Sequence, residues 1–287
     1  MRPAFTKFHG FGNDYIVIEA EELEGISSLG EFARQICNRH YGAGGDGIAV
    51  VKKSETPDAD FNVRIFNPDS SEAALSGNGT RCAAAYLYYQ HLWTEPNLLL
   101  STRAGIKRYT LISNDGHGKF VFDSELGRPK FDTPSIPMLI EPPLEKVIDY
   151  DLNVDGEVFQ VTALQMGNPN CCIFVSDFDS LDWRRIGRLI ENHKQFPDRT
   201  NVVFVRVQDR QSIELRIWER GVGETTASGT CSCAAAVASM ARGNTDRSVD
   251  VTMPGGHAKI QWRMDQEVVI TGSAEVIYSG KWLAQTG

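Results

Sequence analysis

The sequence of 287 residues lacks the features of membrane proteins and of general nucleic-acid binders. It has no apolar run of about 18 residues, the minimum for a membrane-spanning helix, and its charged first thirty residues do not resemble a signal peptide. Basic residues are not in excess, because 29 Lys and Arg stand against 37 Asp and Glu, a net charge of −8. We therefore expect a cytoplasmic protein with no membrane partner and no nucleic-acid partner, because a polyanion binder needs a basic surface.

Metal-binding and disulfide patterns are also missing. The cysteines do not show the C-x-x-C spacing of zinc or thioredoxin-like sites, and the six histidines form no matching ligand pairs. We therefore expect no metal. A chain of this length without an export signal favours reduced thiols. The six thiols belong to Cys37, Cys82, Cys171, Cys172, Cys231 and Cys233.

What is present is a β-rich pattern with a few helices. Ala-rich stretches predict helices after Gly79 and after Thr230, and a third helix is expected over 181–193. A segment from Pro129 to Pro143 holds five of the twelve prolines, which indicates a linker or a sheet edge. Short runs rich in β-branched residues predict strands at 13–18, 47–51, 61–66, 201–207 and 213–218.

The chain contains an internal repeat. Residues 64–77 match residues 216–229 at a constant offset of 152, in the same strand–loop–helix context. The repeat predicts two copies of one α/β unit. We expect the domains to be 1–127 together with 274–287, and 128–273. The matched pairs include Arg64 with Arg216, Glu72 with Glu224, Ser76 with Ser228, and Gly77 with Gly229.

Each copy has a glycine loop followed by a helix, at Ser76–Gly79 and at Ser228–Thr230. A helix N-terminus offers unpaired N–H donors and a partial positive charge, which suit a carboxylate. Two such ends facing across a cleft would hold a small anion with one side chain on each face of its carbon. That arrangement suits a base–acid pair that inverts a stereocentre. Serine is also a good helix cap, so the spacing alone leaves capping and catalysis equally open for Ser76 and Ser228.

Motifs along nearly the whole chain resemble those of the diaminopimelate epimerase family. The resemblance implies an α/β (α+β) fold of two pseudo-symmetric domains, each a curled mixed sheet around a central helix, with the site in the cleft between them. It also implies a cofactor-independent epimerase that interconverts L,L- and meso-diaminopimelate, a lysine and peptidoglycan precursor, and leaves a homodimer open. The motifs are FTKFHGFGND (5–14), HYGAGGD (40–46), NPDSSE (67–72), GNGTR (77–81), GNP (167–169), RTN (199–201), WERGVGET (218–225), PGG (254–256) and GSAE (272–275).

The resemblance also implies roles for individual residues. The backbone amides of Gly77, Asn78, Gly229 and Thr230 would bind the α-carboxylate of the substrate. Glu219 suits an ammonium group, and the fork of Arg220 suits a carboxylate. The remaining polar positions of the expected substrate site are Asn13, Asn67, Asn168 and Asn201.

The reactive centre departs from the family pattern. The two catalytic cysteines of the family lie where this chain has Ser76 and Ser228, its histidine after Gly-Asn-Pro is Asn170, and its glutamine is Gly47. A serine needs a neighbouring base, since its hydroxyl is far less acidic than a thiol. The candidate bases are Glu219, Glu72 and Glu224. Cys231, in the first turn of the second helix, is expected to be a packing thiol.

These departures leave alternatives open. The first is a homologue that binds such a ligand without turnover, and the second is an enzyme that uses Ser and Glu for another reaction, such as dehydration. Replacing both cysteines by serine is also a way to trap a substrate complex. That would not account for Asn170 and Gly47, so natural divergence is the favoured interpretation.

Overall fold

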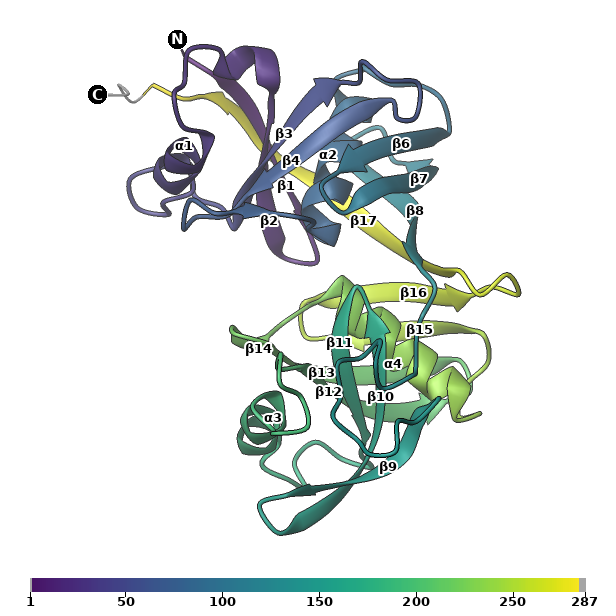
Figure 1. Ribbon diagram of the computed structural model, residues 1–287. Coiled ribbons are helices and arrows are strands. Elements are labelled where there is room, and N and C mark those ends of the chain that lie inside the picture. Colours follow the sequence, from purple (N-terminus) through teal and green to yellow (C-terminus); the bar gives the residue numbers. More distant parts are fainter. Residues whose placement is uncertain (1, 284–287) are drawn as a thin grey trace. The chain divides into compact units, whose positions relative to one another are not determined.

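The computed structural model describes residues 2–283, and the chain divides into two compact units (Figure 1). Unit 1 holds the described residues up to Ser124 and from Gly272 onward, and unit 2 is Glu125–Thr271. Residues 1 and 284–287, which the domain prediction includes, lie outside the described residues. The chain passes from unit 1 to unit 2 within a strand, and it returns within another.

Unit 1 is a mixed sheet. Strands β2 and β3 run parallel, as do β4 and β6. The pairs β1–β2, β3–β4, β6–β7 and β7–β8 are antiparallel. Strand β8 is the one that crosses into unit 2. The elements are β1 (Ala4–Gly10), β2 (Asn13–Glu19), the short 3₁₀ helix η1 (Ala20–Leu23), α1 (Leu29–Ile36), β3 (Gly47–Lys53), β4 (Phe61–Phe66), β5 (Glu72–Ala73), α2 (Gly77–Tyr89), β6 (Asn97–Thr102), β7 (Gly105–Asn114) and β8 (Lys119–Gly127).

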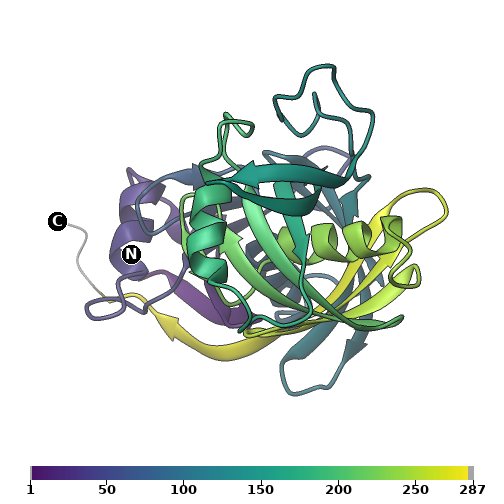
Figure 2. The same ribbon diagram turned by 90° about the horizontal axis from the view of Figure 1, so that it is seen from below.

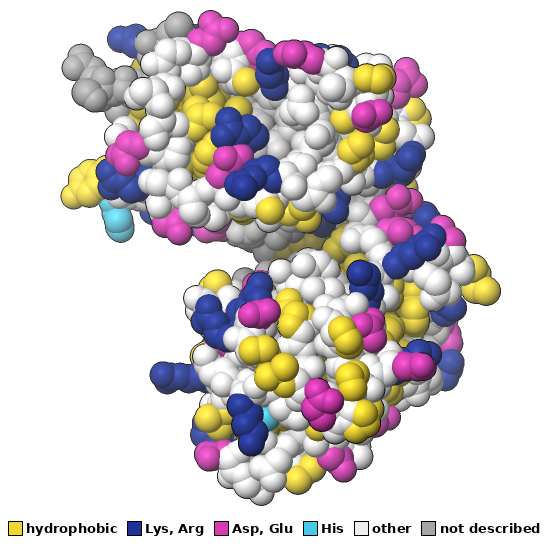
Figure 3. Space-filling model, viewed as in Figure 1, with side chains coloured by type: hydrophobic (Ala, Val, Ile, Leu, Met, Phe, Trp, Pro, Cys, Tyr) yellow, Lys and Arg dark blue, Asp and Glu magenta, His cyan; other side chains and the backbone are white. Residues whose placement is uncertain are grey.

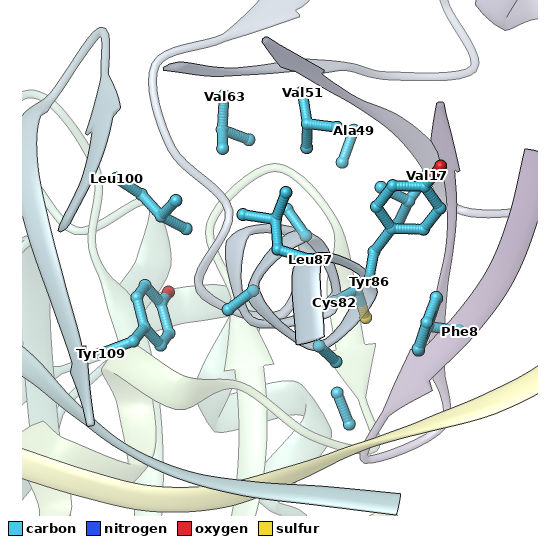
Figure 4. Packing of buried hydrophobic residues seen from close by; sticks show 14 of the residues in the cluster. Phe8, Val17, Ala49, Val51, Val63, Cys82, Tyr86, Leu87, Leu100 and Tyr109 are labelled. Atoms are coloured by element: carbon cyan, nitrogen blue, oxygen red, sulfur yellow. The ribbon is translucent and has the colours of Figure 1, made fainter. Parts of the chain in front are cut away.

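The sheet of unit 1 curls around α2, which packs against β1, β2, β3, β4 and β6. Residues 78–88 of this helix are all buried, because small side chains on its surface let the strands approach from every direction. Figure 4 shows Leu87, Cys82 and Tyr86 pointing outward from the helix into the surrounding strands. The strand side chains that meet them include Phe8, Val17, Ala49, Val51, Val63, Leu100 and Tyr109.

Unit 2 repeats this order of elements, with β9 (Val147–Val154) added in front. Strands β11 and β12 run parallel, as do β13 and β15, which matches the pairing of unit 1. The internal duplication predicted from the offset of 152 is therefore confirmed. The elements are β10 (Glu157–Met166), β11 (Asn168–Phe174), α3 (Trp183–Glu191), β12 (Asn201–Asp209), β13 (Ser212–Glu219), β14 (Gly223–Thr225), α4 (Gly229–Ala241), β15 (Ser248–Met253), β16 (Gly256–Trp262) and β17 (Val268–Lys281), which returns to unit 1.

Helix α4 is the central helix of unit 2. It lies among strands of the unit (Figure 2) and packs against β10, β11, β12, β13, β15 and β16. Its residues 231–240 are buried. Helix α3 covers the other side of the sheet, with Ile186 and Ile190 in a core that includes Val202 and Phe204 of β12. The predicted fold, a curled mixed sheet around a central helix in each copy, is thus confirmed.

The expected elements are found with small shifts. The five predicted strands correspond to β2, β3, β4, β12 and β13, and the third helix is shorter than expected at both ends. Helices α2 and α4 begin earlier than expected, at Gly77 and Gly229, because low-propensity glycines are tolerated in the first turn after an extended cap. Helix α1 was missed, although Ser28 and Glu31 form the S-x-x-E signature of a helix start.

The proline-rich segment does not connect the two units. It lies within unit 2, where Ile136 and Met138 are buried in the core with α3. The connections between units are the strands β8 and β17 instead. The segment between Pro129 and Pro143 contains turns and a single β-bridge, as its prolines predict.

The surface carries charges of both signs. On the face in Figure 3, basic and acidic side chains are interspersed over both units. In the described part of the chain, no helix has the length and apolar character to span a membrane.

Candidate active site

Both predicted serines lie at the N-cap of a central helix. Ser76 precedes α2 and Ser228 precedes α4, and both have extended backbone angles, with φ of −132° and −149°. The first amides of the helices that begin at Gly77 and Gly229 have no acceptor within the helix, so each helix offers N–H donors of the kind that bind anions. The backbones of the two serines are therefore equivalent.

The Ser76 hydroxyl is engaged in capping. Its Oγ accepts a hydrogen bond from the amide of Gly79 at 3.1 Å. The buried phenol of Tyr15 lies close to the Ser76 side chain. Burial raises the pKa of Tyr15 to about 12, and the interaction with the Ser76 hydroxyl partly offsets that rise. At neutral pH the neighbour of Ser76 is thus a neutral phenol, which can donate a proton.

The Ser228 hydroxyl makes no capping bond and donates to a carboxylate instead. Its Oγ lies 3.2 Å from Oε2 of Glu219, and Thr225 donates to the other oxygen at 2.7 Å. Burial raises the pKa of Glu219, while the two hydroxyl donors hold it down in part. A hydroxyl that donates to a carboxylate of raised pKa is in position to pass its proton to that carboxylate. The two hydroxyls therefore differ in their contacts, since that of Ser76 caps its helix and that of Ser228 bonds a carboxylate.

The predicted asparagines of unit 1 are only partly brought together. Asn78 donates to Oδ1 of Asn13 at 3.2 Å, and Asn13 donates to Asp46 at 2.7 Å. Nη1 of Arg81 donates to Oδ1 of Asn78 at 2.8 Å. Asn67, by contrast, donates to Ser71 Oγ at 2.9 Å within a turn. The described contacts of Asn67 are therefore those of a turn residue.

The predicted polar residues of unit 2 form a continuous network. Nδ2 of Asn201 donates to Asn170 at 3.2 Å, and Oδ1 of Asn201 accepts the amide of Arg220 at 2.9 Å. Asn170 in turn donates to the carbonyl of Asn168 at 2.6 Å. The guanidinium of Arg220 donates to the carbonyl of Asp198 at 2.9 Å. Asn201 is thus used to hold the backbone next to Glu219.

Two departures from the family pattern are built into the packing. Asn170 is fully buried, and its amide serves both neighbouring asparagines. A Cβ at Gly47 would lie 2.7 Å from Cε1 of Tyr15 and 2.8 Å from the carbonyl oxygen of Phe66. The tyrosine ring therefore takes the space that any side chain at Gly47 would need.

Cys231 is a packing thiol, as expected. It is fully buried in α4, and burial raises its pKa well above the ordinary value, with the charge of Glu219 adding to the rise. The helix N-terminus does not overcome that burial. In the described part of the chain, all six cysteines are buried and free, and no group of three His, Cys, Asp or Glu side chains could hold a metal ion.

The sequence pattern of the family described as diaminopimelate epimerase matches residues 5–131 and 162–277. A protein named diaminopimelate epimerase from Pelotomaculum thermopropionicum is 40% identical over 283 residues, 98% of this chain and 99% of that protein. The protein of the same name from Halothermothrix orenii is 39% identical over the full length of both chains. The chain belongs to the diaminopimelate epimerase family. This membership confirms the predicted class, an isomerase of the epimerase type.

Two solved structures with other names share the fold. A phenazine biosynthesis protein of the PhzF family from Bacillus anthracis has a TM-score of 0.67 at 17% identity and covers 99% of this chain and all of its own. A hydroxyproline epimerase from Agrobacterium vitis has a TM-score of 0.64 at 14% identity, over 98% of this chain and 90% of its own. At these identities the likeness describes the fold alone.

Each serine with the side chains around it is called a half-site, Ser76 with Tyr15 in unit 1 and Ser228 with Glu219 in unit 2. Sequence reasoning missed two residues of these half-sites. Thr225 ends the motif that contains Glu219 but was not assigned a contact there. Tyr15 stands two residues after Asn13 in β2, and strand alternation places both on one face of the sheet. That spacing was the available signal for a side chain beside Ser76.

Proposed function

We propose that this protein is a cofactor-independent epimerase that interconverts the L,L and meso forms of diaminopimelate by two-sided transfer of the α-proton. The observation that carries the proposal is the hydrogen bond from Ser228 to the buried carboxylate of Glu219. Because the backbone of α2 repeats that of α4, the chain has a serine at the N-cap position of each central helix. Both half-sites are proposed to act on one substrate molecule.

The substrate α-carboxylate would be bound by the helix amides. Gly77 and Asn78 begin α2, and Gly229 and Thr230 begin α4. Their N–H groups stabilise the negative charge that spreads onto the carboxylate when the α-proton leaves. The fork of Arg220 suits the distal carboxylate of a diamino diacid.

Proton removal is proposed on the Ser228 side. The Ser228 oxygen takes the α-proton while its own hydroxyl proton moves to Glu219, so the carboxylate is the net base. The bonding electrons stay on the substrate as a carbanion. General-base catalysis of this kind contributes about 10²–10⁴-fold in rate.

Proton delivery is proposed on the Ser76 side. The Ser76 hydroxyl gives its proton to the opposite face of the carbanion, and the neighbouring phenol of Tyr15 replaces it. The product is the other stereoisomer, with Glu219 protonated and Tyr15 ionised, and a proton passes through solvent to reset the enzyme.

One observation favours a narrower function. The Ser76 oxygen accepts the Gly79 amide, which is the geometry of a cap, and among the described residues no carboxylate is hydrogen-bonded to its side chain. If Ser76 only caps α2, the protein would exchange the α-proton from the Ser228 side without inverting the centre.

The test is α-proton exchange in D₂O with L,L-diaminopimelate, followed by NMR together with the ratio of stereoisomers. We expect exchange with epimerisation in the wild type, and a loss of about 10²–10⁴-fold in Glu219→Gln. Glu224→Gln is the matched control, since that carboxylate is exposed and pairs with Arg184. Exchange without epimerisation would support the narrower function. The absence of both binding and exchange would refute the substrate assignment.

Restoring the family's cysteines is a second test. Ser76→Cys with Ser228→Cys is expected to raise kcat at least about tenfold, because a thiol with a pKa near 8.5 ionises far more readily than a hydroxyl.

We further propose that the protein works in the cytoplasm, which its buried free thiols support. A homodimer stays a prediction, for light scattering to test.

A further inference from the structure

One buried carboxylate holds both ends of the turn that carries Glu219 and Arg220. Glu191, the last residue of α3, is only 5% exposed. Its Oε2 accepts the indole N–H of Trp218 at 2.8 Å, and its Oε1 accepts the amide of Gly221 at 2.7 Å. These donors stand directly before and directly after the Glu219–Arg220 pair.

The carboxylate is matched to this role by charge and by backbone shape. Nη1 of Arg199, a half-exposed side chain, lies 3.3 Å from Oε1 of Glu191 and forms a partly solvated ion pair with it. Gly221 has a φ of +76°, in the left-handed region that glycine adopts readily.

The turn does not depend on Glu191 in order to form. The amide of Val222 donates to the carbonyl of Glu219 at 3.1 Å, and Glu219 pairs with Gly223 across the β13–β14 hairpin. Glu191 therefore adds orientation to a hairpin that closes without it. Orientation is what Glu219 needs, because its carboxylate must stay within reach of Ser228.

We propose that Glu191 is a positioning residue, which clamps Trp218 and Gly221 so that the Glu219 carboxylate faces Ser228 and the Arg220 amide meets Asn201. This inference rests on the proposed function, since it gives Glu219 the role of base. Glu191 itself acts only through the turn.

The decisive variant is Glu191→Gln, which keeps the size of the side chain but can accept only through one atom. Either Gly221 or Trp218 then faces an amide N–H₂ group instead of an acceptor. We expect kcat for epimerisation to fall about 10–100-fold, the loss that a displacement of roughly 1 Å at a catalytic group can cause. Arg199→Gln is the matched control, because it removes the ion pair and keeps both bonds to the turn, and its kcat should stay within about twofold of the wild type.

A readout that does not depend on turnover separates positioning from simple stability. The groups that face Glu219 are Thr225 of β14, and Ser228 and Cys231 at the start of α4. When the turn loosens, Glu219 gains water, and its pKa, raised by burial, should fall toward the ordinary value. Carboxyl ¹³C NMR measures that pKa in the wild type and in both variants, with melting temperatures recorded alongside.

A lower pKa of Glu219 in Glu191→Gln, unchanged in Arg199→Gln, supports the clamp. An unchanged pKa in Glu191→Gln overturns it, even if that variant is less stable. If the wild type shows neither exchange nor epimerisation, the proposed function fails, and the NMR titration still decides whether Glu191 positions the turn.

Discussion

Gly47 offers a sharp steric test of how this chain has adapted around Ser76. Replacing Gly47 by Ala adds a single Cβ, which would lie 2.7 Å from Cε1 of Tyr15 and 2.8 Å from the carbonyl oxygen of Phe66. Real Cβ atoms essentially never approach heavy atoms this closely, so one of the two neighbours must move. The backbone angles at Gly47 are not the obstacle, because its φ is not in the left-handed region.

Neither neighbour moves easily. The Tyr15 ring is wedged from a second side, since Cε1 also lies 2.9 Å from where a Cβ of Gly79 would be. The Phe66 carbonyl belongs to β4, which is paired with β3 at Ile48. We therefore expect a loss near the upper end of the about 1–3 kcal/mol range that overpacking costs. For a protein of this size such a loss lowers Tm by roughly 3–10 °C.

Scanning calorimetry and urea titration of Gly47→Ala measure this loss. Gly45→Ala is the control, because its Cβ meets nothing closer than 3.5 Å and should change stability by at most about 0.5 kcal/mol. A Gly47→Ala protein as stable as the control would refute the view that Tyr15 and Phe66 define this space.

Other predictions concern the two serine half-sites. Thr225→Val removes a hydrogen bond that lowers the pKa of Glu219, so that pKa should rise further. Because the base must be ionised, the acid limb of the pH profile of kcat/KM should move to higher pH. An unmoved acid limb would show that ionisation of Glu219 does not control the rate. Tyr15→Phe removes the phenol beside Ser76, and epimerisation should fall at least about tenfold while α-proton exchange from the Ser228 side persists. Tyr109→Phe is its control, since the buried Tyr109 hydroxyl lies 2.5 Å from Oγ1 of Thr80 in α2, the helix that follows Ser76. Equal losses in both variants would assign Tyr15 a packing role only.

Local sequence patterns and the internal repeat predict much of the fold. The run at 61–66 is β4 residue for residue, because alternating apolar side chains have the period of a strand. The two Ala-rich helices were found because alanine favours helix and small side chains allow burial on all sides. Both helices begin two or three residues earlier than predicted, because glycine has a low helix propensity and its place in the first turn depends on the extended serine before it.

Connections between the units were less accessible to local reasoning. The proline-rich segment indicated a linker, but Ile136 packs into the core of unit 2, and β8 and β17 make the connection instead. Strands are assigned to a unit by their pairing partners, which are distant in sequence. The composition of a segment does not reveal those partners.

The sequence by itself determined the duplication, the family and the equivalent positions of Ser76 and Ser228 in the two copies. Only the tertiary structure decided that they differ. Ser76 and Ser228 are both followed by glycine and an Ala-rich helix, so their local patterns are the same. Their hydroxyls meet different side chains, the phenol of Tyr15 in one unit and the carboxylate of Glu219 in the other. The acidity of a hydroxyl's neighbour depends on burial and on contacts made in space, and a local sequence pattern does not contain them.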